Sequence, residues 1–320
     1  MNKINTTMAG KYAGFSLIEL MVAMTIGLFL VVGVMSVYVN GHRSQGAVDE
    51  QVDMVANARF ALETISADIR QAGIYGRATA TSKINNTSTM PAITGDCVAS
   101  WTANYIFPVF AYNELNSYGS TCNSNYLRGD VLELRGSLRD PVTVLQNNML
   151  YINSDVNGAQ FFYGTTSPGI SLLAKNYQYY VSAYYISANS NVVGDGIPSL
   201  HKVSLQPGGA ISDQVMLSGV ENMQVQIGLA FDDNDDGAPD RLTYVNPNNV
   251  TNWSLAKSVQ IWLVIRPSTL NAGGITTTIN TNIAGQAVTY TNPNSFTVAG
   301  GANDGIRRIV VSTVANLREL

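Results

Sequence analysis

An uncharged apolar run near the N-terminus limits what this chain can fold into. From Leu20 to Val39 the sequence has 20 consecutive residues without a charged side chain. As an α-helix this run would be about 30 Å long, which matches the hydrocarbon core of a bilayer. Lys3 and Lys11 precede the run and most of the chain follows it. We therefore expect a cytoplasmic N-terminus and an exported C-terminal part.

The predicted helix continues beyond the membrane. No proline occurs before Pro91, and Gly73 is suited to a C-cap. Apolar residues recur three, four or seven positions apart at Val48, Val52, Val55, Ala58, Leu62, Ile65, Ile69 and Ala72. This pattern predicts one helix over 15–72, about 87 Å long, which exceeds what one domain can cover. We expect an apolar half at 15–40 that projects, and an amphipathic half at 41–73 that packs on the rest.

The junction between Gly14 and Phe15 lies before the apolar run. An ordinary secretory signal has its small-residue cleavage site after the apolar region, and no such site follows Val39. The segment GFSLIELMVAM resembles the class III leader junction of type IV pilins and type II secretion pseudopilins. The resemblance implies that residues 1–14 are a prepilin leader, that a prepilin peptidase cuts after Gly14, and that Phe15 becomes an N-methylated N-terminus.

Glu19 lies at the edge of the apolar run. A carboxylate costs about 2.5–3.5 kcal/mol near the bilayer centre and less at the interface. The resemblance implies that Glu19 neutralises the amino terminus of a neighbouring subunit's Phe15 during assembly. The alternative is a glutamate at headgroup level without a role.

Residues 74–320 are expected to form a β-rich globular head. Charged residues make up 12% of the chain, against ~25% in an ordinary soluble domain, and Gly, Asn, Thr and Ser replace them. Alternating or short apolar runs predict strands at 130–135, 141–146, 149–152, 159–163, 177–186, 201–205, 213–217, 224–231, 241–245, 259–265 and 309–315. Residues 76–127 and 267–305 read as loops. The predicted fold class is α+β, with a long N-terminal helix on a large antiparallel β-rich head.

Three segments of the head carry a finer resemblance. They are GVENMQVQIGLAFDDNDDGAPDRLTYV, SVQIWLVIRPS and the terminal RRIVVSTVANLREL, and they are similar to PilW-type minor pilins. The resemblance implies a structural subunit of a type IV pilus, anchored in the inner membrane with its head in the periplasm. It implies that the subunit primes assembly and lies near the filament tip. The implied partners are other minor pilins, the major pilin, the inner-membrane assembly platform and a tip adhesin.

Two other functions stay open at this point. PilW-type pilins also resemble the J-type pseudopilins of type II secretion, which gene neighbourhood would distinguish. A membrane-anchored periplasmic enzyme or sensor is the other class. No G-x-S-x-G, P-loop, GxGxxG or metal-spaced histidine pair occurs, and His42 and His201 stand alone. We therefore predict no enzyme activity and no catalytic cofactor. The net charge of −4 and the lack of a dense Lys/Arg run indicate no nucleic-acid partner.

Two sets of residues suggest local sites. Cys97 and Cys122 are the only cysteines, so we expect a disulfide outside the cytoplasm, with two buried thiols as the alternative. Asp232, Asn234, Asp236 and Asp240 have the spacing D-x-N-x-D-G-x-x-D around a glycine, as in a calcium loop, although Thr243 stands where an EF-hand has its bidentate glutamate. A weak Ca²⁺ site and an Asx-rich turn remain equal alternatives for these four residues.

Overall fold

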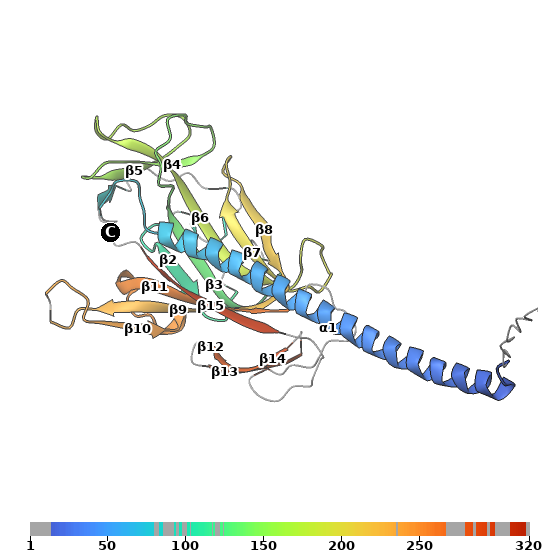
Figure 1. Cartoon of the computed structure of the whole chain (residues 1–320). Helices are drawn as coiled ribbons and strands as arrows, with labels where there is room; N and C mark the ends of the chain where they lie inside the picture. Colours follow the sequence, from blue (N-terminus) through green and yellow to red (C-terminus); the bar gives the residue numbers. More distant parts are fainter. Residues whose placement is uncertain are drawn as a thin grey trace, which may run out of the picture. The chain divides into compact units, whose positions relative to one another are not determined.

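The structure is a computed structural model of the whole chain (Figure 1). It describes residues 14–79, 83–85, 93, 96–97, 101–102, 104–116, 118, 122–123, 125–234, 236–266, 279–283, 286–292, 295–297 and 308–317. One helix and fifteen strands are assigned within these residues. They are α1 (Leu17–Gln71), β1 (Ile84–Asn85), β2 (Val109–Tyr112), β3 (Tyr126–Ser137), β4 (Leu150–Ser154), β5 (Ala159–Tyr163), β6 (Lys175–Ser187), β7 (Ser199–Leu205), β8 (Ile211–Ser218), β9 (Val220–Phe231), β10 (Arg241–Val245), β11 (Ala256–Ile265), β12 (Ile279–Ile283), β13 (Gln286–Asn292), β14 (Ser295–Thr297) and β15 (Ile309–Asn316). Two short 3-10 turns, Pro247–Asn249 and Trp253–Leu255, precede β11.

The helix α1 is continuous over 55 residues, close to the predicted 15–72. It ends where predicted: Gly73 has φ +82°, the left-handed conformation that commonly terminates a helix. The Gly73 N–H donates to the carbonyl of Arg135 on β3 at 2.9 Å, so the end of α1 is tied to the sheet. The chain divides into two compact units, residues 1–52 and 53–320, and α1 belongs to both.

The buried face of α1 begins later than the sequence pattern predicts. Its members are Met54, Ala58, Ala61, Leu62, Ile65, Ile69 and Ala72. Val48 and Val52, which we assigned to the same stripe, are 55% and 60% exposed. At 100° per residue, Val52 lies about 140° around the helix from Ile65, so that part of the prediction was wrong. Met54 and Ala61, which we had not assigned to the stripe, are buried on this face instead.

The head contains antiparallel sheets, as predicted. The largest has the order β1-β5-β4-β6-β3-β2, with β7 paired to β6 and β8 paired to β7. A second has the order β10-β9-β11-β15, and a third has β12-β13-β14. Within the described strands only the short pair β1 and β5 is parallel. Figure 1 shows the last part of α1, residues 53–71, lying along the first two sheets.

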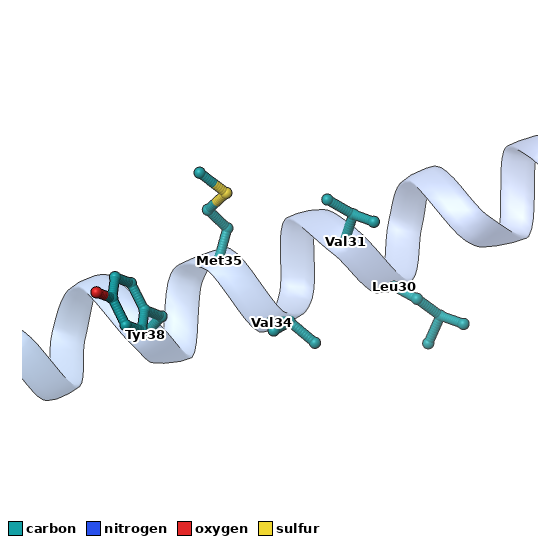
Figure 2. A pocket seen from close by; sticks show the side chains of 5 residues that line it. All are labelled: Leu30, Val31, Val34, Met35 and Tyr38. Carbon is teal, nitrogen blue, oxygen red and sulfur yellow. The ribbon is translucent and has the colours of Figure 1, made fainter.

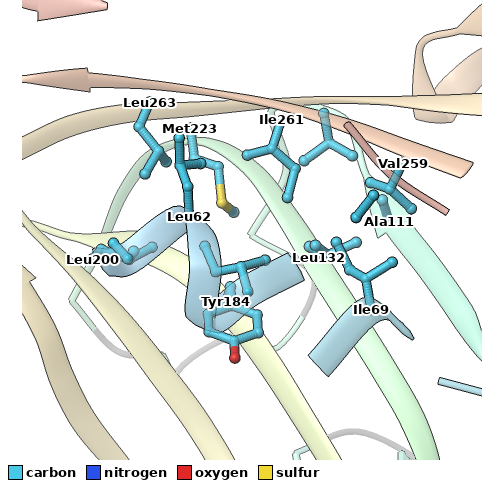
Figure 3. Packing of buried hydrophobic residues seen from close by; sticks show 14 of the residues in the cluster. Leu62, Ile69, Ala111, Leu132, Tyr184, Leu200, Met223, Val259, Ile261 and Leu263 are labelled. Carbon is cyan, nitrogen blue, oxygen red and sulfur yellow. The ribbon is translucent and has the colours of Figure 1, made fainter. Parts of the chain in front are cut away.

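One hydrophobic cluster joins α1 to the two larger sheets. Figure 3 shows Leu62 and Ile69 of α1 facing Leu132 of β3, Met223 of β9 and Ile261 of β11. Each of these five side chains is buried. Truncating such a side chain to alanine costs ~2–5 kcal/mol, so this cluster fixes the helix on the sheets.

Most predicted strands are present, but three segments were misassigned. Residues 141–146 contain only one isolated bridge, between Val142 and Asn176, and Pro141 removes a backbone donor at the start of the segment. The segment 267–305, predicted as a loop, contains the three strands of the β12-β13-β14 sheet. Similarly, the supposed loop 76–127 contains β1 and β2. The strands β12, β13 and β14 are rich in Thr and Asn and lack a long apolar alternation. The strands β1 and β2 have only two and four residues, too few to show a period.

Candidate functional site

The first part of α1 is apolar on every side. Leu17, Phe29 and Val37 are 76%, 79% and 74% exposed. Of the described helices α1 alone is long and apolar enough to cross a membrane. A helix that is hydrophobic all round belongs in a membrane or in the interior of an assembly. This part of α1 can therefore exchange a lipid environment for contact with other apolar helices.

A shallow apolar groove runs along this part of α1. Leu30, Val31, Val34, Met35 and Tyr38 line it (Figure 2). Leu30, Val34 and Tyr38 follow one another at four-residue intervals and so lie along one face. At the polar end of the groove the Tyr38 hydroxyl and the His42 Nε2 are 2.9 Å apart. The groove is open and is lined by apolar side chains.

The predicted processing bond lies outside the helix. Residues 14–16 have no regular secondary structure and α1 begins at Leu17, so the bond between Gly14 and Phe15 lies before the helix. With a side chain 91% exposed, Phe15 is accessible to an enzyme. Residues 1–13, the rest of the predicted leader, lie outside the described residues.

Glu19 has a partner in its own helix. The Ser16 backbone N–H donates to Glu19 Oε2 at 3.0 Å. Ser16 and Glu19 have the S-x-x-E spacing of a capping box, in which an acid in the first turn satisfies a backbone donor and complements the helix dipole. Our sequence reasoning missed Ser16, although this spacing was the available signal. The carboxylate is thus held at the start of α1, one turn from Phe15.

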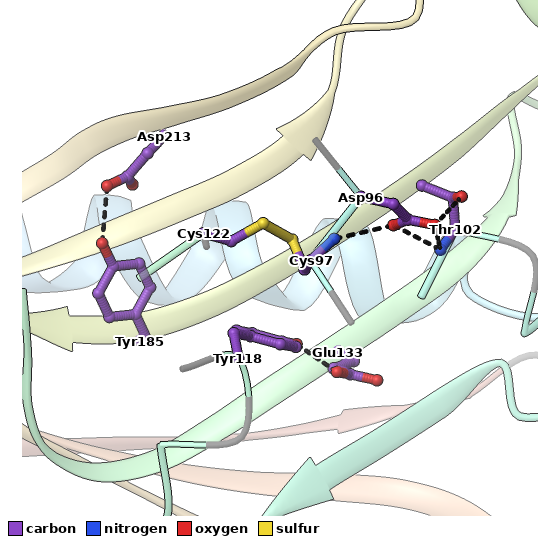
Figure 4. Close-up of a disulfide and its surroundings, with 8 residues drawn as sticks. All are labelled: Asp96, Cys97, Thr102, Tyr118, Cys122, Glu133, Tyr185 and Asp213. Carbon is purple, nitrogen blue, oxygen red and sulfur yellow. Dashed lines mark hydrogen bonds between the residues drawn. A yellow bond between two sulfur atoms is a disulfide. The ribbon is translucent and has the colours of Figure 1, made fainter. Parts of the chain in front are cut away.

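In the head, Cys97 and Cys122 form the predicted disulfide. Their Cα atoms are 5.2 Å apart (Figure 4). The chain between them is also held from β3, because Arg135 donates from Nε to the Trp101 carbonyl at 3.0 Å and from Nη1 to the Phe107 carbonyl at 3.2 Å. The disulfide therefore closes a segment that the sheet already positions.

A buried charge pair supports this anchor. Arg135 Nη2 and Glu133 Oε2 are 2.6 Å apart, and both side chains are almost completely buried. The Tyr118 hydroxyl donates to Glu133, and burial raises the pKa of Tyr118 well above its usual value. Tyr179 donates to the Thr102 carbonyl at 3.0 Å. No sequence motif indicated these partners, because residues far apart in the chain supply them.

The acidic loop is closed by its own backbone. Asp232 accepts the Gly237 N–H at 2.8 Å, Asn234 accepts the Asp236 N–H at 3.0 Å, and Asp236 accepts the Ala238 N–H at 2.8 Å. Asp240 accepts the Asp233 N–H at 2.8 Å. The bonds that Asn234 and Asp236 accept are those of Asx turns, and the other two tie the ends of the loop together. Among the described residues no group of three or more His, Cys, Asp or Glu side chains could hold a metal ion, so the calcium prediction finds no support in this geometry.

His201 joins a loop to a strand. It is buried on β7, with Nδ1 3.0 Å from Asp213 Oδ1 and Nε2 3.1 Å from the Asn189 carbonyl. The Tyr185 hydroxyl donates to Asp213 Oδ2 at 2.6 Å. All four groups satisfy one another, which is the arrangement of a structural histidine.

Comparison with known proteins agrees with these features. The prokaryotic N-terminal methylation motif matches residues 10–35, and the family described as Type IV Pilus-assembly protein W matches residues 183–319. A type IV-like pilin from Thermus thermophilus is similar in structure, with 10% identity, a TM-score of 0.35, and coverage of 82% of this chain and 94% of that one. No curated protein sequence matches the chain significantly.

The methylation motif, the long apolar helix and the β-rich head together define a pilin. The two family matches make the chain type IV pilin-like. Its head is similar to the PilW family, whose model covers residues 183–319 with the C-terminal strands. Pilins are structural, non-enzymatic components, and the chain is a pilin-like subunit.

Proposed function

We propose that this chain is a minor pilin that primes assembly of a type IV pilus and lies near the filament tip. The proposal rests on the presence of two features in one polypeptide. An exposed apolar helix begins at a methylation motif, and a head of the PilW type follows it. In this proposal the head is periplasmic before assembly and joins the filament afterwards.

The proposed sequence of events begins with the leader. Prepilin peptidase removes residues 1–14 and leaves Phe15 as a methylated N-terminus. The helix stays in the inner membrane until the assembly platform brings it to other minor pilins and the major pilin. A tip adhesin is the expected neighbour at the distal end.

We propose that Glu19 guides this docking. Its Oε2 accepts only a neutral backbone donor, Ser16 N–H, so the carboxylate charge is not neutralised within the described part of its helix. In an apolar environment a positive amine from another subunit's Phe15 would lower its free energy. The groove from Leu30 to Tyr38 would receive apolar side chains of the neighbouring helix.

The J-type pseudopilin remains the alternative within the superfamily, and the match to the pilus-assembly family favours the pilus. The test is deletion of the gene, followed by counting of surface pili and assay of type II secretion. We expect pili to be lost, to return with the wild-type chain, and not to return with Glu19→Ala.

The Glu19→Gln variant is a matched control, because it keeps an oxygen acceptor for Ser16 N–H and removes the charge. If the charge drives docking, both variants insert into the membrane and both fail to restore pili. Normal piliation after deletion, or loss of secretion alone, would contradict a role in the pilus.

A further inference from the structure

The strand β15 forms one edge of the second sheet. It pairs with β11 in continuous register from Ile309↔Ile265 to Asn316↔Ser258, without a bulge. No described strand pairs with its other side. Its sequence, IVVSTVAN, contains no charged residue and no proline.

The backbone groups of alternate β15 residues face away from β11. The Leu317 N–H donates to the Lys257 carbonyl at 2.8 Å, which makes residues 257 and 317 a hydrogen-bonded pair. Because such pairs recur every second residue, the odd-numbered residues of β15 bond to β11. The N–H and C=O groups of Val310, Ser312 and Val314 therefore point outward, where an added strand would meet them.

The hydrophobic core is incompletely covered at this edge. Leu263 and Ile265 of β11 are at most 2% exposed, whereas their partners on β15, Val311 and Ile309, pack against the same cluster and are only partly buried. A strand added beside β15 would place its own side chains over this margin. It would need apolar residues at alternate positions to do so.

Other sheet edges carry features that discourage pairing. The strands β1 and β2 have two and four residues. The strand β8 carries Asp213 and has a register shift against β7, and β10 begins with the charged Arg241. Short strands, charges and bulges protect edges from association. Of the edges of the two larger sheets, β15 is the long one without such protection.

We propose that the outer edge of β15 binds an extended strand from the head of a different pilin-type subunit. The added strand continues the β10-β9-β11-β15 sheet and covers Ile309 and Val311. The proposal rests on the proposed function, because the filament provides the neighbouring head.

A second copy of this chain does not fit the edge through its own β15. Two β15 strands paired antiparallel would be related by a twofold axis perpendicular to the sheet. Since residues 53–71 of α1 lie along the face of this sheet, that axis would make the two helices antiparallel (Figure 1). Two subunits anchored by their N-terminal helices in one membrane require parallel helices. A second β15 is therefore excluded, and the proposed role as a minor pilin makes the neighbouring head that of a different subunit.

The test uses the full-length chain in pilus-forming cells. Ser312→Pro removes an outward N–H that has no described partner, so α1 and β11 keep their contacts. Ser312→Lys leaves the N–H and adds a charge to the edge. Ser312→Ala is the matched control. We expect all three to be processed and inserted as wild type, and the first two to fall at least fivefold in sheared pili relative to the major pilin.

The outcomes separate the two proposals. Absence of the wild-type chain from sheared pili would overturn the proposed function. Wild-type incorporation of both Ser312→Pro and Ser312→Lys would overturn the edge proposal alone. If Ser312→Pro lowers the melting temperature, its loss from pili could come from instability. The incorporation of Ser312→Lys then tests the edge proposal. A photo-crosslinking residue at 314 should join the chain to a strand of another pilin-type subunit; a crosslink to a second copy, or none, would contradict the assignment.

Discussion

Asp130 on β3 accepts a hydrogen bond of 2.7 Å from the backbone N–H of Val225 on β9, which joins the two larger sheets. The same carboxylate accepts the Glu114 N–H at 3.0 Å. Asp130 is only 1% exposed. A buried carboxylate thus connects two sheets and a loop through backbone donors.

This connection should depend on pH. Burial raises the pKa of Asp130 from 3.8 to about 7, with a further contribution from the nearby Glu114 charge. Between about pH 4 and 7 the folded state binds this proton and the unfolded state releases it. Stability therefore falls as pH rises through that window, by up to ~1.4 kcal/mol per pH unit, and is level above it.

The Asp130→Asn variant should lose this part of the pH dependence. Urea unfolding of the detergent-solubilised chain at pH 5, 6, 7 and 8 measures it. Asp140→Asn, at an exposed aspartate, is the control and should keep the wild-type slope. Equal slopes for wild type and Asp130→Asn would refute the assignment.

Processing should remove 14 residues. The bond after Gly14 lies outside the helix and Phe15 is exposed, so a peptidase can reach it. Intact-mass analysis of the membrane-purified protein should show an N-terminus at Phe15 with one methyl group. An uncut chain in a host with active prepilin peptidase, or a chain that starts beyond Val39, is incompatible with this prediction.

Removal of the disulfide should destabilise the head without unfolding it. The Cys97→Ala/Cys122→Ala variant loses a link across 25 residues, worth about 3–4 kcal/mol in the chain-entropy model. The contacts of Arg135 with Trp101 and Phe107 should keep the segment in place. Thermal unfolding and far-UV circular dichroism measure the two effects. A reduced wild type that melts like the oxidised form would contradict the estimate.

The acidic loop should be stable without calcium. Its oxygens already accept backbone donors, as between Asp232 and Gly237, so the loop is closed without an added cation. We expect equal melting curves in millimolar calcium and in chelator. The Asp232→Ala variant should lose about 1 kcal/mol in both. Calcium-dependent melting that disappears in Asp236→Ala would instead restore the calcium prediction.

The long N-terminal helix could be predicted because its information is local. A helix needs only a 3.6-residue period, the absence of proline and a terminal glycine, and each is visible in the sequence from Phe15 to Gly73. The strands β9, β11 and β15 could also be predicted, because apolar residues alternate along them. The disulfide could be predicted because Cys97 and Cys122 are the only two cysteines, so only one pairing exists.

Tertiary structure decided the remaining features. Which face of α1 is buried depends on what packs against it, so the stripe could be placed at Val52 or at Met54 until the sheets were known. The contacts Asp130–Val225 and Arg135–Trp101 join residues 95 and 34 positions apart, and no local pattern encodes such distances. The unprotected edge of β15 also follows from sheet order alone. Sequence determines which strands form, and only the closed packing around α1 determines which strand is left at the edge.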